Sequence, residues 1–222
     1  MASRIMHIAI AAQLENILPI KDKNRFFIGH ILPDAVLSAN KRDVNTHFSE
    51  IFDNGKRKHF DYCEFFDRYK NDILSDELYL GYYFHLIEDC IFRVVLYYDI
   101  GLVSRRGDPD FLGELYRDYR ILNGWAVERY GLEYDLYEPE NYKSEKINEI
   151  FPFEAEDLIK DMCSDFNEKI NQEPECFKIK NAENFIEKCV EVCASEYEAI
   201  MRGSHSIGAY DYSWETQTSD SK

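Results

Sequence analysis

Apolar residues recur every three to four positions through most of this chain, which is the spacing expected for one face of an α-helix. Ser3 is suited to cap a first helix that runs to about Leu18 and is closed by Pro19. Further helices are predicted over residues 58–74, 75–99, 108–130, 154–171 and 182–202. One helix follows another, so the sequence predicts an all-α fold in a single compact multi-helix domain.

Two stretches between these helices lack the helical period. Residues 35–56 are predicted to form an irregular loop, and residues 132–153 a long loop that is a candidate to lie over a functional site. The period is also lost beyond Gly203, although three large aromatic residues there are expected to pack, namely Tyr210, Tyr212 and Trp214. We therefore expect a helical domain over residues 1–202 and a partly ordered tail over residues 203–222.

Two polar residues interrupt the most apolar of these predicted helices. His85 and Asp89 are four residues apart, so their side chains lie one turn apart on the same face and can converge on one point. An imidazole and a carboxylate in that position are half of a ligand set for a divalent metal ion. A buried carboxylate needs a counter-charge. The alternative is that Arg93, one turn further on, forms a core ion pair with Asp89.

Three other histidines also lie at positions that suggest a ligand role. His7 lies in an otherwise apolar first helix, and His47 lies in the predicted loop. His30 and Asp34 flank a short Ile-Leu-Pro segment, in which the proline disfavours a continuing helix and favours a turn that presents Asp34. Imidazole nitrogens and carboxylate oxygens without a thiolate suit zinc, or another borderline divalent ion, in a catalytic site.

The order and type of these residues resemble the bacterial zinc-dependent phospholipase C superfamily, which also includes the S1/P1-type nucleases and is all-helical. The resemblance covers about Ser3 to Arg93, and the second half of the chain matches only as further helix. The segments that carry it are His7, Gly29-His30-Ile31-Leu32-Pro33-Asp34, Thr46-His47-Phe48, and Leu80-Gly81-Tyr82-Tyr83-Phe84-His85 with Asp89.

The resemblance implies a role for each matching residue. His47, His85 and Asp89 would share one metal ion, and His7 would help Asp89 to hold a neighbouring ion. Asp34 would be the catalytic carboxylate, which orients or deprotonates the attacking water. Other residues are expected to support these ligands from around the site, namely His30, Glu88 and Arg93.

The chain also departs from the pattern of this superfamily. Its third metal needs two further histidines and a glutamate after the His-x-x-x-Asp pair, but no histidine occurs between His85 and His205. In secreted members the processed N-terminal tryptophan also ligates a metal, whereas this chain begins Met1-Ala2. We therefore expect one zinc ion, or at most two, with another divalent metal as the alternative.

Composition narrows the expected partners. The 222 residues are 45% hydrophobic and 15% aromatic, which argues against disorder. Lys and Arg number 26 against 42 Asp and Glu, a net charge of −16. A chain this acidic repels polyphosphate backbones and anionic membranes, so no nucleic-acid partner is expected. That charge also counts against the nuclease branch of the superfamily.

The cysteines and the N-terminal segment bear on the compartment. The six cysteines form no Cys-x-x-Cys unit, so we interpret them as reduced, buried thiols. The apolar segment after Arg4 is interrupted by His7, unlike a signal peptide, and residues 78–96 carry too many charges to span a bilayer. We expect a cytoplasmic protein without stable membrane insertion. His59 and His205 are expected to be exposed and outside the site, with a tail that folds back and brings His205 to the site as the alternative.

Three functions are compatible with these patterns. The first is a metal-dependent hydrolase of a phosphoric ester, acting on a small phosphoester or a phospholipid-like substrate. The second is a non-catalytic metal-binding or regulatory protein on the same helical scaffold, which the incomplete ligand set favours. The third is a helical interaction domain whose histidines are satisfied core residues.

Overall fold

The computed structural model describes residues 1–35, 45–147, 155–167 and 170–216, and within them the protein is mostly helical. The helices are α1 Arg4–Glu15, α2 Lys23–Gly29, α3 Tyr62–Ile73, α4 Glu77–Val94, α5 Phe111–Tyr130, α7 Ala155–Asn167 and α8 Ile179–Met201. A small antiparallel sheet has the order β1 Ser49–Phe52, β2 Arg57–Phe60, β3 Trp214–Glu215. The prediction of a mostly helical fold is confirmed, and both α2 and the sheet are additions to it.

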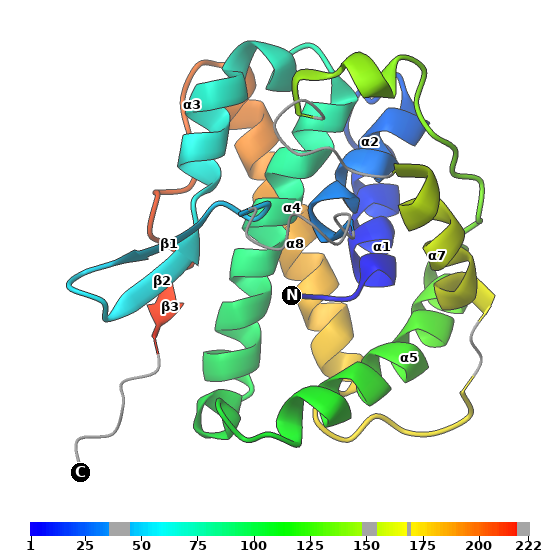
Figure 1. The fold of residues 1–222 in the computed structure, drawn as a ribbon, viewed down its shortest axis with the longest axis vertical. Coiled ribbons are helices and arrows are strands. Elements are labelled where there is room, and N and C mark those ends of the chain that lie inside the picture. Colours follow the sequence, from blue (N-terminus) through cyan, green and yellow to red (C-terminus); the bar gives the residue numbers. More distant parts are fainter. Residues whose placement is uncertain (36–44, 148–154, 168–169, 217–222) are drawn as a thin grey trace.

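Helix α4 is the central element of the fold. Figure 1 shows it running through the middle of the molecule, with α3 and the sheet on one side and α1 and α5 on the other. The Asp76 side chain accepts a hydrogen bond from the Leu78 main-chain nitrogen and so caps the helix. Every residue from Leu78 to Phe92 is buried. Polar side chains on this helix therefore project into the interior and need partners there.

Two glycines let α2 approach α4 very closely. A Cβ atom added to Gly29 would lie 2.2 Å from the main-chain oxygen of Leu78, and one added to Gly81 would lie 2.3 Å from that of Phe26. Real Cβ atoms do not approach other atoms so closely. The contact brings the end of α2, and the segment that follows it, against the middle of α4.

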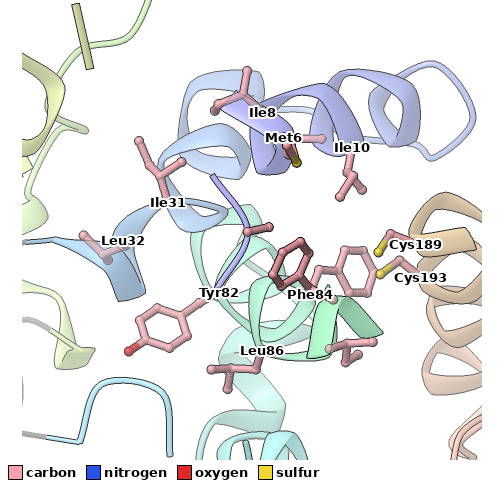
Figure 2. Close-up of a cluster of buried hydrophobic side chains, with 14 of the residues drawn as sticks. Met6, Ile8, Ile10, Ile31, Leu32, Tyr82, Phe84, Leu86, Cys189 and Cys193 are labelled. Atoms are coloured by element: carbon pink, nitrogen blue, oxygen red, sulfur yellow. The ribbon is translucent and has the colours of Figure 1, made fainter. Parts of the chain in front are cut away.

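The apolar core joins three helices around this centre. Figure 2 shows Met6 and Ile10 of α1, Phe84 of α4, and Cys189 and Cys193 of α8 gathered in one cluster. Each of these side chains is fully buried. Burying a large apolar side chain contributes about 1.5–3 kcal/mol, so this cluster holds α4 firmly relative to its neighbours.

The loop predicted over residues 35–56 is wrong in its second part. Residues 49–60 form a β-hairpin, whose turn places Asp53, Asn54 and Gly55 at positive φ. Strand β2 also replaces the first turn of the helix predicted from residue 58, which begins at Tyr62 with Asp61 as its cap. Residues 36–44 of the predicted loop lie outside the described residues.

Part of the segment after α8 packs on this hairpin. Trp214 pairs with Lys58 in the sheet, and its ring lies 5.0 Å from that of Phe60. Trp214 is buried, whereas the side chain of Tyr210 is half exposed. The aromatic residues of the tail therefore lie over the sheet, and residues 217–222 lie outside the described part of the chain.

The expectation that two further histidines are exposed is wrong for one of them. His59 is buried, with Nε2 2.7 Å from a Glu50 carboxylate oxygen and Nδ1 3.0 Å from the main-chain oxygen of Ala209. The tail covers this residue, which no pattern within residues 57–60 could indicate. His205 is partly exposed, and its Nδ1 lies 2.7 Å from the buried carboxylate of Glu196.

The second predicted loop packs against α2. The main-chain nitrogen of Tyr137 donates to Asn24, and the Glu145 carboxylate lies 2.7 Å from an Arg25 guanidinium nitrogen. A short 3-10 turn spans Tyr142–Ser144, and residues 148–153 fall outside the described ranges. The loop also contacts α3 through Lys146 and Asp72, the start of α4 through Tyr79, and α7 through Tyr134.

The cysteines are free, but they are not uniformly buried. Cys90, Cys189 and Cys193 are buried, while Cys63 and Cys176 are half buried and Cys163 is exposed. The prediction of six buried thiols is therefore wrong for Cys163, which lies on the outer face of α7. Among the helices described, none combines the length and the apolar content that crossing a bilayer requires.

Candidate metal centre

Three separate segments bring imidazoles and carboxylates to one place. His85 and Asp89 come from α4 itself and are fully buried. Asp34 ends the short 3-10 turn Leu32–Asp34, which Pro33 opens, and His47 lies just before β1. The turn predicted to present Asp34 is thus present, and the structure brings together residues that are up to 55 positions apart in the chain, counted from Asp34 to Asp89.

Three nitrogen and oxygen atoms form a nearly equilateral triangle. His47 Nε2 lies 3.2 Å from His85 Nε2 and 3.4 Å from Asp89 Oδ2, and the last two atoms are 3.6 Å apart. Zinc binds such atoms at about 2.0–2.2 Å, which in a tetrahedron separates the ligand atoms by about 3.3 Å. The triangle therefore has the dimensions of one face of a tetrahedral zinc site.

Asp34 adds a second carboxylate to this triangle. Its Oδ1 lies 3.4 Å from His47 Nε2, is buried, and has no hydrogen-bond partner. The residue also lines a pocket of about 370 Å³ that opens beside the site. Asp34 consequently adjoins both the three-atom face and this pocket.

A second group of ligand atoms shares Asp89. Its Oδ1 accepts a hydrogen bond from the Ala2 main-chain nitrogen at 2.9 Å and lies 3.5 Å from His7 Nε2. The His7 ring stacks on that of His85 with centroids 4.1 Å apart. The two oxygens of Asp89 thus face different imidazoles, Oδ1 that of His7 and Oδ2 those of His47 and His85.

Several buried polar atoms of this site have no hydrogen-bond partner. Leaving a buried donor or acceptor unsatisfied costs about 1–3 kcal/mol, and such atoms are rare in folded proteins. Here they include Asp34 Oδ1, Asp89 Oδ2 and His7 Nε2 among the ligand atoms, and also His30 Nε2 and Glu88 Oε1, which lie 3.2 Å from each other. A cation bound among them would satisfy the ligand atoms directly, so the residues present fit a zinc ion.

Neighbouring groups orient the imidazoles so that they could bind a metal ion. His85 Nδ1 donates to the main-chain oxygen of His30 at 2.7 Å, which places the proton on Nδ1 and leaves the Nε2 lone pair facing the triangle. His7 Nδ1 lies 2.6 Å from Glu88 Oε2 and is fixed in the same way. Metal-binding histidines typically donate their other nitrogen to a carbonyl or carboxylate group.

The electrostatics favour a cation at the triangle. Burial would lower the pKa of His47, but hydrogen bonds to Asp34 and Asp89 outweigh it and raise that pKa to about 8. Burial and the charge of His7 lower the pKa of His85. Burial would raise the pKa of Asp89, but the N-terminal charge and the three neighbouring imidazoles hold it well below its usual range. In the metal-free protein, a proton on His47 supplies part of the positive charge that a metal ion would bring.

In the second group of ligand atoms, His7 holds its proton more tightly than His47 does. Burial lowers the pKa of His7, but the carboxylates of Asp89 and Glu88 outweigh that effect and raise it to about 10. Burial would raise the pKa of Glu88, which His30 and His7 nevertheless lower to about 2. An ion at His7 must displace this proton, so the site at His47 and His85 is the better of the two at neutral pH.

Comparison with models of protein families, with curated proteins and with solved structures finds no match for this chain. The resemblance to the phospholipase C superfamily thus stays a prediction from the residues named for it. The geometry around His85 and Asp89 carries the functional interpretation by itself.

Arg93 does not form the ion pair that was the alternative account of Asp89. Its Nη1 donates to the Tyr97 hydroxyl at 2.9 Å, and no contact with Asp89 within 4.0 Å is seen in the part of the chain described. The buried carboxylate instead accepts a hydrogen bond from the Ala2 nitrogen at Oδ1, and three imidazole nitrogens lie 3.4–3.6 Å from its oxygens. A metal site explains that arrangement better than a core ion pair does.

Tyr82 is a positioning residue that sequence reasoning missed. Its hydroxyl, which Figure 2 shows directed away from the core cluster, donates to the main-chain oxygen of Thr46 at 2.5 Å. On the other side of His47, the main chain at Phe48 has a φ of 50°, which costs energy for a residue with a side chain. The hydrogen bond and the backbone at Phe48 fix the main chain on the two sides of His47. In the sequence, only its position one helical turn before His85 marks Tyr82.

Proposed function

We propose that this protein is a metal-dependent hydrolase of a phosphoric ester. The observation that carries the proposal is the triangle of His47, His85 and Asp89 atoms, with edges of 3.2–3.6 Å, beside a carboxylate that lines a pocket. Three protein ligands with one open position are typical of catalytic zinc sites, whereas structural sites are closed by four. We take zinc as the metal, with one ion at this triangle.

The protein residues have separate tasks in this reaction. A bound zinc ion supplies a polarised phosphoryl oxygen and a water of lowered pKa. Asp34 is placed to accept the proton of that water, since its carboxylate adjoins both the triangle and the pocket. Asp89 and His85 hold their ligand atoms from one rigid helix. The main-chain oxygen of His30 orients His85, His7 stacks on His85, and Glu88 holds the His7 ring.

A non-catalytic metal-binding protein is the second candidate. It is favoured by the absence of any histidine between His85 and His205, which leaves the superfamily's third metal without its ligands. The two candidates share the metal site and differ only in turnover. A purely structural role for the histidines, the third possibility, predicts no bound metal.

Metal content and turnover separate these accounts. Protein purified without chelator is expected to hold one to two equivalents of zinc by elemental analysis, and His85→Ala and His47→Ala each to lose most of it. His205→Ala is the matched control, because that histidine contacts Glu196 and Phe66 outside the site. Equal trace metal in all four proteins would refute the metal site. Bound zinc without hydrolysis of any of a panel of phosphate mono- and diesters would favour the non-catalytic protein.

A further inference from the structure

The pocket beside Asp34 has its own chemistry. It is formed where the N-terminal residues meet α4 and α5, and its polar lining includes Arg93, Arg120, Asn123 and Tyr116. Helix α5 contributes most of these side chains, and none of them belongs to the group of ligand atoms. Whatever occupies this pocket lies next to the metal centre and in contact with these residues.

Arg93 places an unusual positive charge there. Its Nε is buried without a hydrogen-bond partner, and its Nη1 donates to a neutral hydroxyl, that of Tyr97. No carboxylate lies within ion-pair distance of it in the described ranges of the chain. In a chain with 42 acidic residues against 26 basic ones, a half-buried guanidinium without a counter-ion is unexpected. A guanidinium binds carboxylates and phosphates through paired N–H donors.

The other two arginines that line the pocket can be compared with Arg93. Arg4 also lines it, but its charge is balanced by Asp161 at 3.2 Å and Asp165 at 2.8 Å. Arg120 also lines the pocket with an exposed side chain, and the carboxylates of Asp34 and Asp165 line it as well. Because Arg4 is balanced, the positive charge for which the described contacts show no carboxylate is that of Arg93.

Asn123 supplies a further polar atom. It is buried, lines the pocket, and its Oδ1 has no hydrogen-bond partner among the residues described. An amide oxygen can only accept, so it suits a hydroxyl group of a ligand. The rings of Tyr116 and Tyr119 line the same space and would suit an ammonium group, but the guanidinium of Arg93 repels one.

From these contacts we propose that the pocket binds the part of the substrate beyond the reacting phosphoryl group, and that this part is anionic and hydroxylated. The inference rests on the proposed phosphoester chemistry at the neighbouring centre. It narrows the substrate class to anionic phosphoesters and excludes esters that carry a quaternary ammonium group. Arg93 is the residue that determines this specificity, with Arg120 and Asn123 as its partners.

A pair of phosphomonoesters tests the proposal. 3-Phosphoglycerate carries a carboxylate and a hydroxyl where phosphocholine carries a trimethylammonium group, and both present the same phosphate to the metal. Calorimetric titration of the zinc-loaded protein is expected to show 3-phosphoglycerate binding at least about tenfold more tightly, as one charge-assisted contact allows. Arg93→Gln is expected to remove most of that preference, and Arg120→Gln a smaller part.

Arg129→Gln is the control, because Arg129 lies on α5 with Arg120 but does not line this pocket, and its Nε is 3.8 Å from a Glu183 carboxylate oxygen. It removes the same charge and is expected to leave the preference unchanged. Arg93→Lys retains the charge and keeps the test valid if Arg93→Gln does not fold. It should keep an intermediate preference.

The possible outcomes distinguish the proposed pocket from the proposed hydrolase activity. Equal or tighter binding of phosphocholine overturns the proposal. A preference that survives Arg93→Gln and Arg120→Gln also overturns it, because the carboxylate would then be binding to the metal. A preference that depends on Arg93, in a protein that hydrolyses no ester, keeps the pocket and refutes the hydrolase. Hydrolysis without any charge preference keeps the hydrolase and refutes the pocket.

Discussion

Gly29 of α2 and Gly81 of α4 meet face to face, so that a Cβ atom on Gly29 would lie 3.0 Å from the Cα atom of Gly81. This approach has a direct consequence for the metal centre. It brings the main-chain oxygen of His30, which directly follows α2, within 2.7 Å of His85 Nδ1. The orientation of a candidate ligand thus depends on two helices being closer than side chains would allow.

Replacing Gly81 by alanine is therefore expected to damage both fold and site. The new Cβ would lie 2.3 Å from the main-chain oxygen of Phe26 and 2.9 Å from His30 Nδ1, so α2 must move away. Overpacking of this kind costs about 1–3 kcal/mol. Urea unfolding should show that loss, and zinc affinity should fall with it.

Gly113 provides the matched control for this substitution. It lies in α5, and a Cβ there would meet nothing within 4 Å. Gly113→Ala is expected to stabilise the protein by about 0.5–1 kcal/mol, because alanine favours an exposed helix more than glycine does. If Gly81→Ala were as harmless as Gly113→Ala, the close approach of α2 and α4 would not constrain the site.

Removal of the metal is expected to lower stability. Without an ion, the carboxylates of Asp34 and Asp89 and three unsatisfied nitrogen or oxygen atoms remain buried together. Metal at about 100 times its dissociation constant stabilises the folded state by about 2.7 kcal/mol. In a chain of this size that corresponds to a rise in Tm of about 5–10 °C. A melting curve unchanged by exhaustive chelation would favour a core role for these residues.

The stabilisation by zinc is expected to grow with pH. In the metal-free protein the pKa of His47 is about 8, above the 6.5 of an ordinary histidine. The protonated imidazole therefore stabilises the metal-free fold fully below pH 6.5, and this contribution is lost as the pH rises through 8. Zinc needs the neutral form and must displace that proton at lower pH.

The rise in Tm on adding zinc should thus be smaller at pH 6 than at pH 8, as measured by calorimetry in buffers that do not bind zinc. Asp34→Asn removes one of the two carboxylates that raise the pKa of His47, so it should shift this dependence to lower pH. A zinc-induced shift that is independent of pH would mean that His47 is not a ligand.

The sequence predicts much of this site because its ligands are polar residues in apolar surroundings. His85 and Asp89 stand out on α4 for that reason, and Pro33 marks the turn that carries Asp34. What places His47 could not be predicted in the same way. The hydroxyl of Tyr82 and the backbone at Phe48 act through contacts between segments distant in the chain.

The β-hairpin and the C-terminal segment that packs on it were not predicted, for a related reason. Its two four-residue strands are short and partly exposed, so they lack a clear alternating pattern. The third strand comes from Trp214 and Glu215, more than 150 residues later in the chain. Pairing between such distant segments leaves no local signal, whereas a helix is determined by residues within a few turns of each other.

Asp34 provides the test that separates an enzyme from a metal-binding scaffold. Asparagine is nearly isosteric with aspartate and can still accept a hydrogen bond from a water, but it cannot take up the proton of that water. Removing a general base lowers the rate by a factor on the order of 10² to 10⁴. Asp34→Asn is therefore expected to keep the fold and most of the zinc while losing most hydrolysis of a chromogenic phosphodiester.

His85→Ala is the comparison, because it should lose both metal and activity. The position of Asp34 Oδ1, 3.4 Å from His47 Nε2, also allows the carboxylate to bind the ion directly. In that case Asp34→Asn would shed the metal as His85→Ala does, and elemental analysis of the two variants side by side would show it. Asp34 would then be a fourth ligand, and the base that activates the water would have to be sought elsewhere in the pocket. Retained zinc with lost turnover leaves proton transfer as the one task that asparagine cannot perform there.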